Sequence, residues 1–129
     1  MRGLAVWYDG STYYYIADTD NHRIVRIKAD GTGYATFGTR GTGTDQFMSP
    51  EGITGDGTHL YIPDTGNNRL VKCALDGSGF STFGSVGSGT NQFNTPKGID
   101  IDTATSNLYI ADLGNNRVVM TKFDGTGWA

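Results

Sequence analysis

A six-residue motif that occurs three times constrains the fold of this chain more than any other feature. Each copy starts with Asp, has Asn as its fourth residue and ends with Arg, and each lies just after a Tyr-Ile pair. The copies occupy residues 18–23, 64–69 and 112–117, so they start 46 and 48 residues apart. Self-similarity at a period of about 20–50 residues indicates a repeat architecture. The chain of 129 residues is therefore predicted to contain three copies of one structural unit.

The middle repeat predicts what one unit contains. Short runs rich in β-branched and aromatic residues alternate with Asp-Gly pairs and with the motif, which are turn signals. A long glycine-rich passage, residues 84–96, then leads to the next repeat. Four short antiparallel strands per unit, at a period of about 40–50 residues, are typical of the blades of a β-propeller. The strands predicted for the middle repeat are residues 52–55, 59–62, 70–75 and 80–83.

The third strand of this repeat is apolar on both sides. Leu70 and Ala74 face one side of the strand, and Val71, Cys73 and Leu75 face the other. A sheet covered on both faces needs this pattern, whereas a sheet with one wet face alternates between apolar and polar residues. The fold class predicted is all-β, with blades of four antiparallel strands packed face to face.

The order of short motifs in each repeat resembles that of the NHL-repeat β-propellers. Pro-x-Gly-Ile is followed by Leu-Tyr-Ile-x-Asp, Asn-x-Arg, Asp-Gly and Phe-Gly, and the similarity covers nearly the whole chain. The Asn-His-Leu signature of that family corresponds here to residues 21–23, 67–69 and 115–117. The resemblance implies NHL-type blades. It leaves the function open, because propellers of this kind bind proteins or RNA or act as enzymes.

Three blades do not close a propeller, which needs about four to eight. At roughly 60° per blade of a six-bladed ring, three blades span half a turn and expose two apolar end faces. We therefore expect two copies to close a six-bladed ring as a head-to-tail homodimer. An engineered or partial-gene fragment of a propeller would show the same sequence pattern. The predicted boundaries within the single repeat domain 1–129 are about 3–47 for blade one, 48–93 for blade two, and 94–129 for blade three, whose outer strand is truncated.

We interpret the six-residue motif as a structural turn between the second and third strands. Its Asp is expected to accept backbone N–H groups, and its Arg to bind a carboxylate or carbonyl groups of the adjacent blade. Gly66 and Gly114 are expected to supply a positive φ, with Asp20 at that position in the first copy. The motif residues assigned this role are Asp18, Asn21, Arg23, Asp64, Asn67, Arg69, Asp112, Asn115 and Arg117.

Three further residues are candidates for binding. Because chain direction alternates, the motif turns and the long glycine-rich passages should share one face of the ring, where Arg40 varies against Val86 of the next repeat. A peptide or protein ligand is expected on that face. Asp100 and Asp102 follow the first strand of blade three, which should line the central channel, and two carboxylates there are candidates for a cation site or an acid–base pair.

The composition argues against a metal site, a cofactor, a disulfide, a nucleic-acid partner and a membrane span. His22 and His59 lie in different repeats, and Cys73 is the single cysteine, so no metal, cofactor or disulfide is expected. The formal net charge of −3 argues against a nucleic-acid partner. No apolar run approaches the roughly 18 residues of a membrane span. Residues 1–4 lack the apolar core of a signal peptide, which favours a cytosolic product but leaves the compartment open.

The function predicted from the sequence is a non-catalytic propeller scaffold that assembles with itself and binds a protein or ligand on its loop face or in its channel. The alternative that the resemblance implies is a propeller enzyme, lyase-like or lactonase-like, with a metal in the central channel. RNA binding is a third reading, which the acidic charge balance disfavours.

Overall fold

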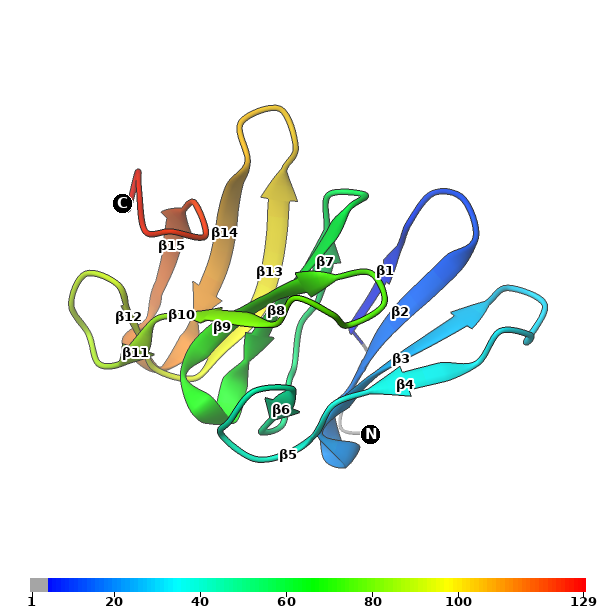
Figure 1. The fold of residues 1–129 in the computed structure, drawn as a ribbon. Helices are drawn as coiled ribbons and strands as arrows, with labels where there is room; N and C mark the ends of the chain where they lie inside the picture. Colours follow the sequence, from blue (N-terminus) through cyan, green and yellow to red (C-terminus); the bar gives the residue numbers. More distant parts are fainter. Residues whose placement is uncertain (1–4) are drawn as a thin grey trace.

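The computed structural model describes residues 5–129, so the predicted start of blade one at residue 3 lies outside the described part. The chain forms three antiparallel sheets that fan out side by side (Figure 1). In each sheet the strands lie in chain order, so that each strand pairs with the next one. The prediction of an all-β fold built from propeller blades is therefore confirmed.

Each blade consists of short strands joined mostly by tight turns. Blade one contains β1 (Ala5–Tyr8), β2 (Tyr13–Asp18), β3 (Arg23–Lys28) and β4 (Ala35–Phe37). Blade two contains β7 (Thr54–Gly55), β8 (His59–Asp64), β9 (Arg69–Ala74) and β10 (Ser81–Phe83). Blade three contains β13 (Pro96–Asp102), β14 (Asn107–Asp112) and β15 (Arg117–Thr121).

The connections between blades and within the motif have structure of their own. Two short parallel pairs form in the glycine-rich passages, β5 (Thr39–Arg40) with β6 (Gln46–Phe47) and β11 (Ser85–Val86) with β12 (Gln92–Phe93). Each motif contains one turn of 3₁₀ helix, η1 (Thr19–Asn21), η2 (Thr65–Asn67) and η3 (Leu113–Asn115).

The strand register makes positions in the three blades equivalent. In each blade the residue at the third position of the second strand pairs with a residue of the third strand, and the pairs are Tyr15 with Arg26, Tyr61 with Lys72, and Tyr109 with Met120. We call the face of a blade that carries this Tyr its forward face, because in blades one and two that face packs against the next blade. The opposite face of each blade is its backward face.

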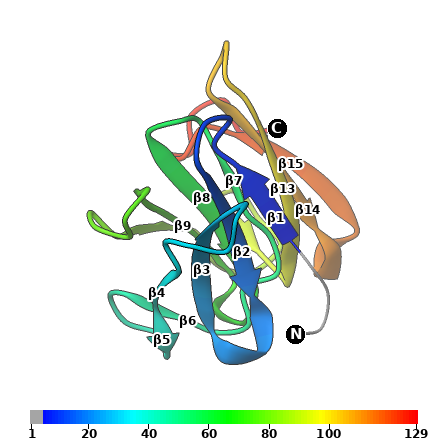
Figure 2. The ribbon, with the colours of Figure 1, turned by 90° about the vertical axis from the view of Figure 1, so that its right-hand side faces the viewer.

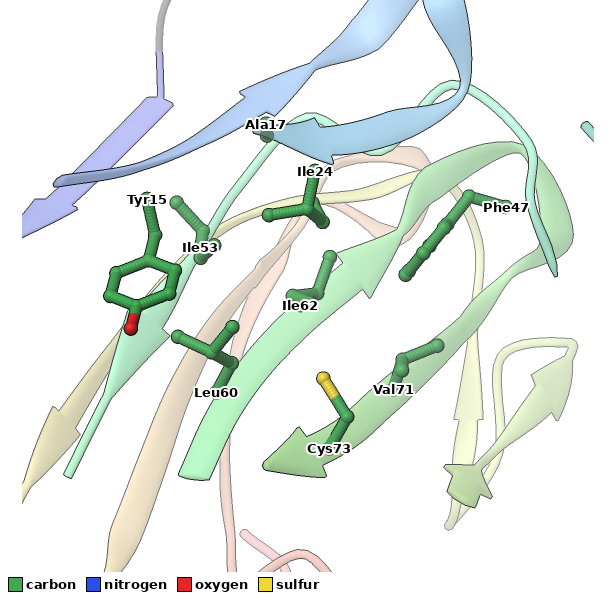
Figure 3. Close-up of a cluster of buried hydrophobic side chains, with 9 residues drawn as sticks. All are labelled: Tyr15, Ala17, Ile24, Phe47, Ile53, Leu60, Ile62, Val71 and Cys73. Atoms are coloured by element: carbon green, nitrogen blue, oxygen red, sulfur yellow. The ribbon is translucent and has the colours of Figure 1, made fainter. Parts of the chain in front are cut away.

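The core between blades one and two joins a forward face to a backward face. Tyr15, Ala17 and Ile24 of blade one pack against apolar side chains of blade two (Figure 3). Phe47, from the connection, is completely buried beside them. The blade-two members of the cluster are Ile53, Leu60, Ile62, Val71 and Cys73.

The core between blades two and three repeats this arrangement. Tyr61 and Leu70, on the forward face of blade two, are buried with Leu108, Ile110 and Val119 of blade three. Phe93, the counterpart of Phe47, is also completely buried in this cluster. Blade two thus buries both of its faces, as the apolar pattern of its third strand predicts, and Phe47 and Phe93 fill the spaces between blades.

Candidate functional site

The motif forms a buried polar cluster around its Asp. The Asp64 side chain is fully buried and sits at the end of β8. Its Oδ2 accepts hydrogen bonds from Asn67 Nδ2 and Arg69 Nε, both at 2.8 Å, and its Oδ1 accepts one from the Met48 amide at 2.7 Å. Asp112 has the same three contacts in blade three. The carboxylate is therefore satisfied internally and has an adjacent positive charge.

The Arg of the motif fastens the connection from the preceding blade. Arg69 donates hydrogen bonds of 2.8–3.3 Å to the carbonyl groups of Thr42, Gly43 and Gln46. Arg117 makes the same contacts with the next connection, residues 88–92. Arg69 and Arg117 thus each bind their own motif carboxylate and three carbonyl groups of the connection that leads into their blade.

In the described part of the chain, the Arg of the blade-one motif binds its Asp but no carbonyl group of a connection. Arg23 Nε donates to Asp18 Oδ2 at 2.9 Å, but its Nη2 donates to Tyr34 Oη at 3.3 Å. The Arg23 side chain is 34% exposed, against 13% for Arg69.

The pKa values of Asp18 and Asp64 are shifted in opposite directions, and Asp64 is the more deeply buried of the two. Burial raises the pKa of Asp64 above its ordinary value, although the hydrogen bonds and the guanidinium act the other way. At Asp18 burial also acts to raise the pKa, but the hydrogen bonds from Asn21 and Arg23 outweigh it and lower the pKa.

The prediction of which motif residue has a positive φ was wrong. The left-handed residue is the fifth of the motif, and φ is 55° at His22, 53° at Asn68 and 52° at Asn116. The side chains of the first two then cap the following connection: His22 Nδ1 accepts the Ser49 amide at 2.9 Å, and Asn68 Oδ1 accepts the Thr95 amide at 2.8 Å. Asn tolerates this conformation better than most residues, and its oxygen is placed to bind the next loop.

Gly66 and Gly114 are needed for close approach instead. The Gly66 amide donates to the Met48 carbonyl at 2.7 Å, and a Cβ at Gly66 would lie 2.6 Å from that oxygen. Gly114 meets Asn94 in the same way. The third position of the motif is small because another segment of the chain crosses it.

Of the other sequence candidates, two lie on one face of the same strand and the third lies in a connection between other blades. Asp100 and Asp102 lie on β13 with exposed side chains on the forward face of blade three, and Asp102 Oδ1 accepts the Ala104 amide at 3.0 Å. Arg40 lies on β5, in the connection between blades one and two, and is also exposed. Within residues 5–129 no ion pair joins Arg40 to either Asp, and no three His, Cys, Asp or Glu side chains are grouped to hold a metal.

The sequence prediction of two apolar end faces corresponds to particular exposed residues. On the forward face of blade three, Val118 is 68% exposed and Tyr109 is 40% exposed. On the backward face of blade one, Val6 and Tyr8 are 42% and 43% exposed. The view in Figure 2 looks onto the blade-one side of the molecule, where β1 and β2 have no sheet in front of them.

A hollow on the backward face of blade one is a feature that sequence reasoning missed. It has a volume of about 550 Å³ and a largely apolar lining. Comparing Ala29 with its counterparts Leu75 and Phe123 in the aligned repeats would have revealed it, because the small residue leaves the space open. The lining consists of Val6, Tyr14, Ile16, Ile27, Lys28, Ala29 and Gly31.

Comparison with known proteins supports the fold. No protein-family model matches the sequence, and no curated protein matches it significantly. Among solved structures, a chain of a nidogen/laminin complex is 22% identical with a TM-score of 0.80, over 98% of this chain and 46% of that one. Streptogramin B lyase is 14% identical with a TM-score of 0.71, over 95% of this chain and 38% of the lyase.

An auxiliary nutrient-binding protein from Bacteroides thetaiotaomicron is 20% identical with a TM-score of 0.67, over 89% of this chain and 36% of that one. These neighbours are β-propeller proteins of the NHL/YVTN type, which confirms the resemblance at the level of the fold. The chain spans less than half the length of each of them. Within residues 5–129 no helix is long and apolar enough to cross a membrane.

Proposed function

We propose that this chain is a non-catalytic propeller scaffold that assembles with a second copy into a closed six-bladed ring. The observation that carries the proposal is the burial of equivalent forward-face positions. Ile24 and Leu70 are completely buried against the next blade, whereas Val118, at the same position of blade three, is 68% exposed. Blade three therefore presents a forward face without a following blade.

Blade one presents the complementary half of the same type of interface. Ile62 and Ile110 are completely buried on the backward faces of blades two and three, while their counterpart Ile16 lines the open hollow on blade one. A forward face packs on a backward face at both internal joints, and the two end faces are one of each kind. Two half rings would bury both pairs of end faces at once, which gives a head-to-tail contact that closes.

The polar groups of the motif are engaged in structure, which supports a scaffold without catalysis. Asp64 and Asp112 are buried and fully hydrogen-bonded, and they face the connections between blades. The single thiol, Cys73, is completely buried, and burial raises its pKa to about 12. A nucleophilic Cys needs the opposite, a lowered pKa and access to solvent.

A peptide or protein ligand belongs, in this proposal, on the face that carries the motif turns. The long connections lie there, as their contacts with Arg69 and Arg117 show, and they differ in sequence between blades. Arg40 in the first connection and Val86 in the second are both exposed and differ in charge. Loops on a rigid scaffold are where binding specificity usually varies.

The test of assembly is the solution mass of this chain measured by native mass spectrometry and light scattering across a dilution series. A mass of two chains that persists on dilution, with a compact shape by small-angle scattering, is the expected result. A folded single chain at every concentration would overturn the proposal.

A further inference from the structure

The hollow on blade one contains a small residue where the other blades have a large one. Ala29 lies at the position of Leu75 in blade two and Phe123 in blade three. Leu75 packs against the core between blades one and two, and Phe123 packs against the core between blades two and three. At those joints the larger side chain contacts the preceding blade. At blade one the corresponding space, about 550 Å³, is open.

The forward face of blade three also differs from the forward faces of blades one and two at one position. The residue that pairs with the forward-face Tyr is Arg26 in blade one, Lys72 in blade two and Met120 in blade three. Arg26 lies over the Tyr13 ring, and Lys72 lies 5.8 Å from the ring centres of both Tyr61 and Phe123. Replacing the cation with Met makes this face more apolar than its counterparts.

The internal joint shows where the forward Tyr points. The rings of Tyr61 and Phe123 lie 6.1 Å apart across the joint between blades two and three. Tyr109 is the counterpart of Tyr61, and Ala29 is the counterpart of Phe123. A joint of the same geometry between blade three of one copy and blade one of another would place the Tyr109 ring at the open space.

We propose that the hollow on blade one is the docking site for Tyr109 and Met120 of a second copy of this chain. The proposal rests on the ring described above and names the contact that selects the partner. Because the hollow is apolar and shaped by Ala29, it recognises the forward face of blade three rather than that of blades one or two, each of which carries a cation at the Met120 position. This distinction sets the order in which blades meet.

The test fills the hollow and removes the inserted ring in separate variants. Ala29→Glu places a carboxylate in the apolar hollow, opposite a face that already carries Asp100 and Asp102, and Tyr109→Ala removes the ring. Each is expected to weaken self-association by about 30-fold or more, the effect of losing a central contact of an interface. Thr82→Ala, an exposed change on the outer strand of blade two, is the matched control and should leave association unchanged. Thermal unfolding followed by circular dichroism checks that each variant is folded.

Mixing the two variants makes the test specific for a head-to-tail contact. The mixture retains one intact joint, between the ring of the Ala29→Glu copy and the hollow of the Tyr109→Ala copy. Two-chain species that contain one of each variant should therefore appear where neither variant alone associates. If the unaltered chain is a dimer and Ala29→Glu dimerises equally well, the docking site is refuted while the ring survives. If the unaltered chain never associates, the ring itself fails.

Discussion

The Nε of Arg69 donates a 2.8 Å hydrogen bond to Oδ2 of Asp64, a carboxylate that is completely buried. The remaining nitrogens of Arg69 bind three carbonyl groups of the connection between blades one and two. One ion pair thus links a strand end within a blade to the segment that joins two blades. Its loss should affect the packing of blades more than the folding of a single sheet.

Asp64→Ala should lower the free energy of unfolding by about 3–5 kcal/mol, because it leaves a largely buried guanidinium without its carboxylate. Urea unfolding followed by circular dichroism measures this loss. Asp18→Ala is the matched control, since its partner Arg23 is more exposed and, within residues 5–129, makes no hydrogen bond to a loop carbonyl group, and it should cost clearly less. Equal losses in the two variants would show that the connection adds nothing to the ion pair.

Gly66→Ala should be destabilising by about 1–3 kcal/mol, because the added methyl group would push against the Met48 carbonyl and overpack the contact. Gly79→Ala is the informative comparison. Gly79 has a φ of 66° and no neighbour within 4 Å of an added Cβ, so its cost is about 1 kcal/mol of backbone strain alone. Denaturant unfolding of both variants separates the cost of the steric contact at Gly66 from the cost of backbone strain at Gly79. A larger loss of stability in Gly79→Ala than in Gly66→Ala would show that the contact with Met48 is not what requires a glycine at position 66.

The Asp56 and Tyr61 side chains predict how stability depends on pH. Tyr61 Oη donates to Asp56 Oδ2 at 3.1 Å. Burial, with the nearby Asp56 charge, raises the pKa of Tyr61 to about 12. A raised pKa means that the folded state holds this proton more tightly than the unfolded state does. The contribution is therefore complete below the ordinary value of 10.0 and is lost as pH rises through about 12.

Tyr61→Phe should reduce the alkaline loss of stability in that range, and it should also cost about 1 kcal/mol at neutral pH for the lost hydrogen bond. Urea unfolding at a series of alkaline pH values, compared with the unaltered chain, measures both effects. Identical pH profiles would mean that other groups dominate the alkaline transition.

The Cys73 thiol should be unreactive toward a disulfide reagent in the folded chain. It is completely buried, and its pKa is raised to about 12, so thiolate is scarce and shielded. Because it is the single cysteine, its modification rate reports directly on opening of the joint between blades one and two. The rate should rise with urea along the unfolding curve, and rapid modification under native conditions would contradict the packing described here.

The sequence by itself determined the features that depend on short-range patterns. The spacing of the motif gave three units, the Asp-Gly pairs placed turns, and the two apolar sides of residues 70–75 required a sheet covered on both faces. These features follow from backbone preferences and periodicity, which act over a few residues.

Only the tertiary structure decided how each motif position is used. Gly66 is small because Met48, 18 residues away in sequence, crosses it, and Asn68 takes the positive φ that the sequence had suggested for the glycine. Leu70 and Val118 occupy equivalent positions, yet one is buried and the other is 68% exposed. Their exposure differs because a blade packs on Leu70 and none packs on Val118 within residues 5–129 of this chain. Contacts between blades join residues that are far apart in sequence, so no local pattern relates them.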